Sequence, residues 1–266
     1  MKKMWLNIGA VFLCVCVILA GMLIFNTQRK KEAKRNESAS YSYSRKMARE
    51  DKNSFNTENS RLDAFGDSIV HGYNGSDDKV MYNPYINIVA TSFGMSLDNH
   101  AINQATVSGN ADKDIYKQIE KANLKYTDYV YISAGVNDYY AKARLTTVKN
   151  KLQSEIDLIR KKNKTVKILA ALPLPAYKTA GQTTLGTGDA YNAANSLGLN
   201  LSDYCDALME VYSKNNIPVL DYRGAQPWNI SDFKTATIDG IHPTEKSHEK
   251  LAKKVISFFR VNIKKE

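Results

Sequence analysis

The stretch LDAFGDSIVHGY (residues 62–73) joins a short apolar run to Gly66, Asp67 and Ser68. The apolar run is typical of a buried strand, and the glycine and polar residues after it mark its end. Similar runs follow at 97–102, 129–134, 166–172 and 218–222. Helix-period segments lie near 82–94, 111–123, 143–162, 187–214 and 244–263. Strands that alternate with helices predict an α/β fold with a parallel sheet covered on both faces.

Polar motifs follow three of the predicted strands. They are GDS (66–68) after the first strand, GVND (135–138) after the third and DGIHP (239–243) after the fifth. The carboxyl ends of parallel strands meet at one edge of a sheet, where folds of this class place their chemistry. We therefore expect Ser68, Asn137 and His242 to lie close together.

Ser68 is the candidate nucleophile, because a serine hydroxyl becomes reactive when a neighbouring base takes its proton. His242 is the histidine best placed to act as that base. Asp239, three residues earlier, can accept a hydrogen bond from the other ring nitrogen and stabilise the imidazolium. Each residue alone is common in caps, turns and loops, so only their joint occurrence points to catalysis. The other histidines are weaker candidates: His71 follows the serine turn, His100 is expected inside a strand, and His248 on the outer face of the last helix.

Three blocks of the sequence resemble blocks one, three and five of the SGNH, or GDSL-like, hydrolases. They are AFGDSIVHGY (64–73), SAGVNDYY (133–140) and DGIHPTEKSHEKLA (239–252). The resemblance covers residues 62–264 and implies a three-layer α/β/α sandwich with a five-stranded parallel, flavodoxin-like sheet. It also implies a serine hydrolase with Ser68, Asp239 and His242 as catalytic residues and without a metal or cofactor.

The resemblance further implies an oxyanion hole made by the backbone N–H of Ser68, the backbone N–H of a glycine after the second strand, and the Asn137 amide. The second block departs from its usual form N-x-A-x-x-G, because Gln104 occupies the glycine position of Asn99–Gln104. Glutamine can still donate its backbone N–H, but its side chain is expected to enter the pocket and its φ is restricted. A competing alignment uses Gly109 and needs five further loop residues. We favour Gln104, two residues beyond the expected strand end.

These features predict a serine esterase that hydrolyses short-chain or O-acetyl esters through an acyl-serine intermediate. The expected substrate is a small acyl ester or an O-acetylated glycan of cell-wall or extracellular polysaccharide, contacted by Asp67, Tyr177 and Trp228. An O-acyltransferase with the same triad and a lysophospholipase-like lipid esterase are alternatives. A catalytically silent, surface-tethered binding domain is the non-enzyme alternative.

The N-terminal region differs from the rest of the chain. Met4–Phe25 is an uncharged run of 22 residues, long enough to cross a bilayer. We expect a membrane anchor or signal sequence at 1–26, a polar basic tether at 27–61 and a catalytic domain at 62–266. The prediction is an extracellular domain on a single-pass anchor in the cell membrane, with secretion after signal cleavage as the alternative.

Charge and cysteine content exclude some functions. Residues 1–62 hold twelve Lys/Arg against five Asp/Glu, which is seven of the ten net positive charges and leaves +3 for the remainder. Because the excess lies mainly in the tether, nucleic-acid binding is not expected. Cys205 is alone in the predicted domain, so no internal disulfide can form there, and we expect a buried small hydrophobe. A monomer is expected.

Overall fold

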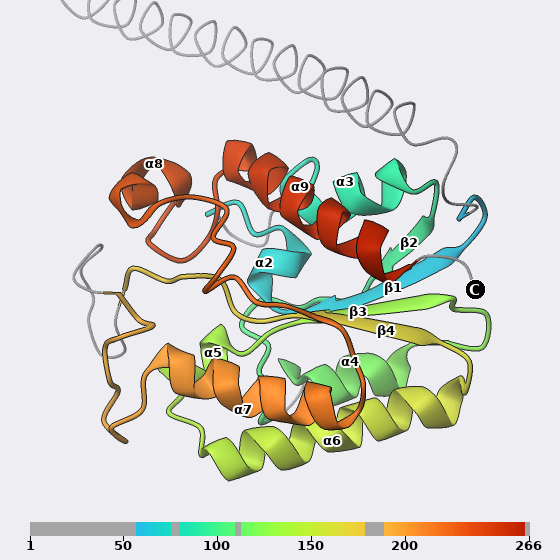
Figure 1. The fold of residues 1–266 in the computed structure, drawn as a ribbon, viewed down its shortest axis with the longest axis horizontal. Coiled ribbons are helices and arrows are strands. Elements are labelled where there is room, and N and C mark those ends of the chain that lie inside the picture. Colours follow the sequence, from blue (N-terminus) through green and yellow to red (C-terminus); the bar gives the residue numbers. More distant parts are fainter. Residues whose placement is uncertain (1–56, 76–79, 110–112, 179–188, 264–266) are drawn as a thin grey trace, which may run out of the picture. The chain divides into compact units, whose positions relative to one another are not determined.

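Five parallel strands form the sheet in the computed structural model, which describes residues 57–75, 80–109, 113–178 and 189–263 (Figure 1). Their order across the sheet is β2-β1-β3-β4-β5. The strands are β1 (Arg61–Gly66), β2 (Ser96–Asn99), β3 (Tyr129–Ser133), β4 (Lys167–Ala171) and β5 (Val219–Leu220). The strand order reverses direction between β1 and β3, the position at which open α/β sheets bind ligands. The predicted α/β fold with a five-stranded parallel sheet is confirmed.

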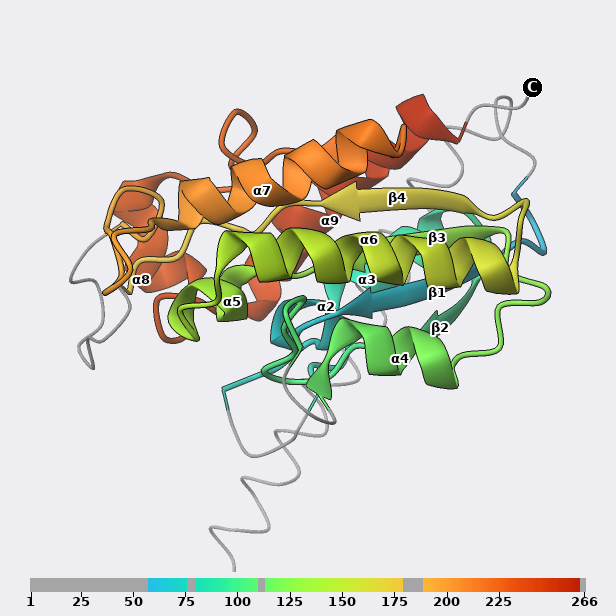
Figure 2. The ribbon, with the colours of Figure 1, turned by 90° about the horizontal axis from the view of Figure 1, so that it is seen from below.

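Helices cover both faces of this sheet (Figures 1 and 2). One layer consists of α3 (Tyr85–Ser92) and α9 (Glu245–Asn262). The other consists of α4 (Ile115–Lys121), α6 (Leu145–Lys162) and α7 (Leu201–Lys214). Shorter helices lie toward the carboxyl ends of the strands, namely α2 (Ser68–His71), α5 (Val136–Tyr140), η2 (Ile230–Asp232) and α8 (Phe233–Ala236). In this three-layer sandwich, the long helices cover the faces of the sheet, and short helices and loops lie at the carboxyl ends of the strands.

The central strands are apolar because both of their faces are buried. In β3, alternate side chains enter two different cores: Val130 and Ile132 pack under α4, α6 and α7, whereas Tyr129 and Tyr131 pack under α3 and α9. Burial of apolar surface contributes about 25 cal/mol per Å². Continuous apolar strands thus hold the two helical layers on one sheet.

Two expectations about the helices differ from the structure, one in the start of a helix and one in the face that a residue occupies. The segment 187–214 was expected to be helical throughout, but α7 begins only at Leu201, where Asn200 and Asp203 form a reciprocal capping box. Such a box satisfies the free N–H groups of a first turn and fixes the start of the helix. The last helix is correctly predicted, but His248 was expected to face solvent and is instead fully buried. The reason is its phase, because it shares a face with Leu251, Ala252 and Val255.

The described structure begins within the segment 27–61 that was expected to be a tether. Thr57 is buried, and its hydroxyl donates to the Phe93 carbonyl at 2.6 Å. Within the described part of the chain, no helix is both long and apolar enough to cross a membrane. The longest described helices, α6 and α9, are amphipathic. The anchor or signal sequence expected at 1–26 lies outside the described residues, so no anchor is shown, and the predicted localisation in the cell membrane is corrected.

Glu155 of α6 is an ionisable group inside the apolar core. It is fully buried, and neither carboxyl oxygen has a hydrogen bond of ordinary geometry among the described residues. Burial raises the pKa of Glu155 well above its usual value, and the charges of Asp138 and Asp114 raise it further. Because the folded state binds this proton more tightly than the unfolded chain does, the free energy of unfolding is highest while Glu155 is protonated and falls as the pH rises.

We expect Glu155→Gln to stabilise the protein at pH 8 and to have little effect near pH 4.5. The unfolded chain releases the Glu155 proton near its ordinary pKa, so wild-type stability falls as the pH rises from there toward the folded pKa. Each unit between the two pKa values corresponds to about 1.4 kcal/mol. Urea unfolding at several pH values measures this effect, with Glu249→Gln on the exposed face of α9 as the control. Parallel pH profiles for wild type and Glu155→Gln would contradict the prediction.

Candidate active site

Ser68 lies at the turn between β1 and α2, at the carboxyl end of the sheet. The strand register places Gly66 opposite Ser133, so β1 and β3 end at the same level. Asp67 caps α2 by accepting a hydrogen bond from the Ile69 N–H at 3.0 Å. A methyl group on Gly66 would lie 2.3 Å from Val70 Cγ2 and 2.5 Å from the Ser133 carbonyl oxygen. The tight turn therefore requires glycine before the Asp67-Ser68 pair.

Asp239 and His242 form a pair within one turn of the chain. One carboxylate oxygen of Asp239 accepts from His242 Nδ1 at 2.7 Å, and the other accepts from the backbone N–H groups of Ile241 and His242. Burial opposes ionisation of Asp239, but its bonds to the ring and backbone of His242 outweigh burial and lower its pKa to about 2. The carboxylate is thus charged at neutral pH and fixes the orientation of the imidazole.

The structure brings this pair to the serine. Ser68 Oγ lies 2.8 Å from His242 Nε2, although the two residues are 174 positions apart in the chain. With Nδ1–H donated to Asp239, Nε2 carries the lone pair that can accept the hydroxyl proton. The ring of Tyr73 packs against His242 with a centroid separation of 4.6 Å. Sequence reasoning missed Tyr73, although its position five residues after Ser68 places it beside the same turn.

Asn137 and Gln104 lie on neighbouring segments. Asn137 Nδ2 donates one hydrogen to the Ala105 carbonyl at 2.9 Å, which leaves its second amide hydrogen for a ligand. Gln104, the residue before Ala105, has a left-handed backbone with φ +66°. A methyl group on Gly109 would instead lie 3.4 Å from Asp114 Oδ2 and 3.8 Å from Lys151 Cε. Asn137 thus bonds to the carbonyl of Ala105, which directly follows Gln104 in the chain, and not to a residue next to Gly109.

Gln104 differs from the sequence-based expectation in the direction of its side chain. That side chain was expected to enter the pocket, but Gln104 is exposed and its Oε1 accepts from Lys113 Nζ at 2.9 Å. The Gln104 backbone adopts the left-handed region, which costs a non-glycine residue roughly 1–2 kcal/mol. The backbone therefore takes the form that a glycine would take, and the side chain points to Lys113.

The three residues expected to contact substrate are all buried. Asp67 is 3% exposed, and burial raises its pKa to about 6 against the opposing effects of the Ile69 N–H and the His242 charge. Tyr177 and Trp228 are 3% and 4% exposed and belong to the core under α3 and α9. The Tyr177 ring packs on Phe233, and its N–H donates to the Gly240 carbonyl at 2.7 Å. Asp67 thus supports the serine loop and Tyr177 the histidine loop, and Trp228 is buried in the same core as Tyr177.

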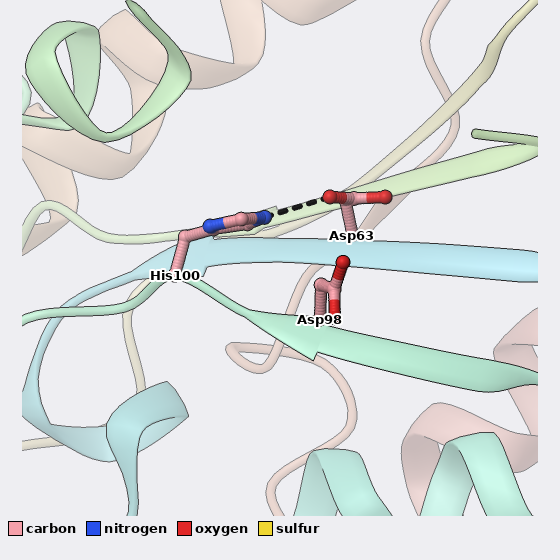
Figure 3. Close-up of side chains that lie close together, drawn as sticks. All are labelled: Asp63, Asp98 and His100. Atoms are coloured by element: carbon pink, nitrogen blue, oxygen red, sulfur yellow. Dashed lines mark hydrogen bonds and ion pairs between the residues drawn. The ribbon is translucent and has the colours of Figure 1, made fainter. Parts of the chain in front are cut away.

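One group of side chains among the described residues has the composition of a metal site. Asp63, Asp98 and His100 bring their potential ligand atoms within 4.8 Å of one another (Figure 3). However, Arg61 forms ion pairs with Asp63 and Asp98 at 3.0 and 2.5 Å, and His100 Nε2 and Thr127 Oγ1 also bond to Asp63. The carboxylates already have a cation and donors, so the cluster is better explained as an ion-pair network that joins β1 to β2.

Comparison with known proteins agrees with this arrangement of strand ends. The model of the GDSL-like lipase/acylhydrolase family matches residues 64–250. The chain belongs to this family. The match includes Ser68, Asn137, Asp239 and His242, and the family assigns the protein to the esterases and acylhydrolases. No match was found among curated proteins.

Solved structures of other proteins share the fold. A Lactobacillus plantarum protein is 20% identical with a TM-score of 0.61, covering 77% of this chain and 98% of its own. A carbohydrate acetylesterase family member from Sinorhizobium meliloti is 15% identical with a TM-score of 0.58, covering 77% and 99%. A family two carbohydrate esterase from Clostridium thermocellum in complex with cellohexaose is 18% identical with a TM-score of 0.56, covering 77% and 65%. At these identities the likeness concerns the fold of this GDSL family member.

Proposed function

We propose that this GDSL family protein is a serine esterase that removes short acyl groups, acetyl above all, from carbohydrate esters. The observation that carries the proposal is the hydrogen-bonded series Ser68 Oγ, His242 and Asp239, with distances of 2.8 and 2.7 Å. Two structural neighbours are described as a carbohydrate acetylesterase family member and a carbohydrate esterase, which supports a glycan substrate.

In the proposed first step, Ser68 Oγ attacks the ester carbonyl while His242 Nε2 takes the hydroxyl proton. The tetrahedral oxyanion would receive hydrogen bonds from the Ser68 and Gln104 N–H groups and the second amide hydrogen of Asn137. Collapse breaks the bond to the alcohol oxygen, which leaves with the proton from His242, and an acyl-serine remains. Charge from Asp239 stabilises the imidazolium during this transfer.

Water then hydrolyses the acyl-serine by the same steps. His242 takes a proton from water, the hydroxide oxygen attacks the acyl carbon, and the Ser68 oxygen recovers the proton as the acid is released. The hydrogen bonds that join Ser68, His242 and Asp239 support both steps of the proposal.

The proposal is tested by labelling and by a panel of esters. A fluorophosphonate should label wild-type protein, because it reacts with activated serines. The rate should be higher for acetyl than for butyryl and long-chain esters of the same alcohol, and O-acetylated oligosaccharides should release acetate. Absence of both labelling and hydrolysis in folded protein would favour a silent binding domain. Faster turnover of long-chain esters would favour a lipid esterase.

A further inference from the structure

The segment Ile102–Ala105 is bonded to the strand end that carries the candidate nucleophile and to Asn137. The Ile102 N–H donates to the Gly66 carbonyl at 3.2 Å, two residues before Ser68. At the other end of the segment, the Ala105 carbonyl accepts from Asn137 at 2.9 Å. Because both ends are bonded to strand-end residues of the site, Gln104 between them is held at its margin.

The Gln104 side chain binds the ammonium group of Lys113 at this segment. Its left-handed backbone directs an exposed side chain outward, and the amide oxygen accepts from Lys113 Nζ at 2.9 Å. A glycine at position 104 would offer no such acceptor. The side chain that departs from the family pattern therefore holds an ammonium group at residue 104, whose backbone N–H is one of the proposed oxyanion donors.

In the described part of the chain, the side-chain partner of Lys113 is a neutral amide. The ion pairs found between described residues do not include Lys113. Two described acids of neighbouring segments face inward: Asp114 is 7% exposed and accepts from the Lys117 N–H, and Asp138 is fully buried and accepts from the Val107 and Ser108 N–H groups. A molecule arriving from solvent thus meets the ammonium group before it meets either carboxylate.

A second lysine approaches the same loop. Lys151 Nζ would lie 3.9 Å from a methyl group on Gly109, five residues after Gln104, and lies 5.8 Å from the Tyr116 ring centroid. Ammonium groups therefore flank the 104–109 loop from both α6 and the segment before α4. Opposite charges attract at such short range in water, and they attract more strongly near a protein surface.

We infer that Lys113, positioned by Gln104, binds a negatively charged group of the substrate. The inference rests on the proposed ester hydrolysis and narrows its substrate to acyl esters that carry a carboxylate or phosphate near the scissile bond. An acetylated acidic glycan has this chemistry. Lys113 contributes to the choice of substrate, whereas bond cleavage belongs to Ser68, His242 and Asp239.

The test compares charged and neutral esters of matched shape. 4-Acetoxybenzoate and 4-acetoxyphenyl phosphate carry the anion on the alcohol, and methyl 4-acetoxybenzoate is their neutral counterpart. 4-Nitrophenyl succinate and 4-nitrophenyl butyrate form the corresponding pair for an anion on the acyl group. The quantity measured is the ratio of kcat/KM for the charged ester to kcat/KM for its neutral counterpart.

We expect Lys113→Ala to lower this ratio about five- to tenfold in at least one pair, and Lys113→Glu to lower it further. High salt should reduce the wild-type ratio, because it screens exposed charges. Lys164→Ala, which removes an exposed lysine before β4 at the opposite end of the strands, is the matched control and should leave the ratio unchanged.

The pairs also identify the anion. A loss confined to the carboxylate ester or to the phosphate ester identifies the preferred group, and either result supports the inference. An unchanged ratio in all pairs, with hydrolysis intact, would overturn it and leave the proposed esterase standing. A loss of equal size in Lys164→Ala would also overturn it, because the effect would then follow net charge alone. Absence of both hydrolysis and fluorophosphonate labelling in wild type would remove both proposals.

Discussion

Alanine at position 68 is expected to abolish ester hydrolysis, with a fall in kcat on the order of 10⁵ to 10⁶, as in other serine hydrolases that lose their nucleophile. The Ser68 hydroxyl lies 2.8 Å from His242 Nε2, the base proposed to take its proton. Fluorophosphonate labelling should disappear in the same variant. Thermal unfolding should change little, because only one hydroxyl is removed.

Two further variants separate the roles in the triad. His242→Ala should be nearly as damaging as Ser68→Ala, since the base is lost. Asp239→Asn should be severe, on the order of 10⁴, because it disturbs the tautomer while the imidazole remains. Full turnover by folded Ser68→Ala protein would exclude Ser68 as the nucleophile.

Proline at position 104 is expected to lower kcat toward a small acetyl ester by two to three powers of ten. It removes the backbone N–H that is proposed to bind the oxyanion, and its ring fixes φ near −65°, whereas Gln104 has φ +66°. Glycine should be tolerated at the same position, because it adopts positive φ without steric cost. Gln104→Ala retains the N–H and should keep most activity toward this neutral ester.

The competing donor provides the control for this prediction. Gly109 also has a positive φ, at +97°, so Gly109→Pro imposes a comparable change on the same loop. Circular dichroism and thermal unfolding establish that both proline variants are folded. If Gly109→Pro loses activity while Gln104→Pro keeps it, the second oxyanion donor lies at Gly109. If Gln104→Ala is as damaging as Ser68→Ala, the glutamine amide itself takes part in the chemistry.

The alternation of strands and helices was predictable because it depends on local patterns. β3 and β4 are within one residue of the predicted limits at each end, since apolar runs bounded by polar residues are needed wherever a strand is buried on both faces. β2 ends at Asn99, earlier than expected, where the Asn99 side chain bonds to the Val70 carbonyl and the Ala101 N–H. The late start of α7 likewise reflects a side-chain cap at Asn200, whose effect periodicity alone does not reveal.

The proximity of Ser68 and His242 was predictable because both residues follow strand ends, whereas the burial of Tyr177 and Trp228 depends on packing. The approach of His242 to Ser68 follows from the topology, because parallel strands end at one edge. Whether Tyr177 and Trp228 face solvent depends on how their loops fold over α8 and α9, which no local pattern specifies. The burial of His248 could have been predicted, since the apolar residues Leu251, Ala252 and Val255 of α9 follow it at three, four and seven residues.

Ser68 and His242 are 174 residues apart in the chain, so catalytic activity depends on the packing of the C-terminal segment against the rest of the domain. Asp239 and His242 come as a preassembled unit, but β5, the loop after it and α9 must dock before that unit reaches the serine. If this segment detached, the base His242 would move away from the nucleophile Ser68 while β1, β3 and β4 stayed paired. Partial denaturation or a protease cut after β5 is therefore expected to abolish activity before the sheet is lost, and addition of the C-terminal fragment is expected to restore activity.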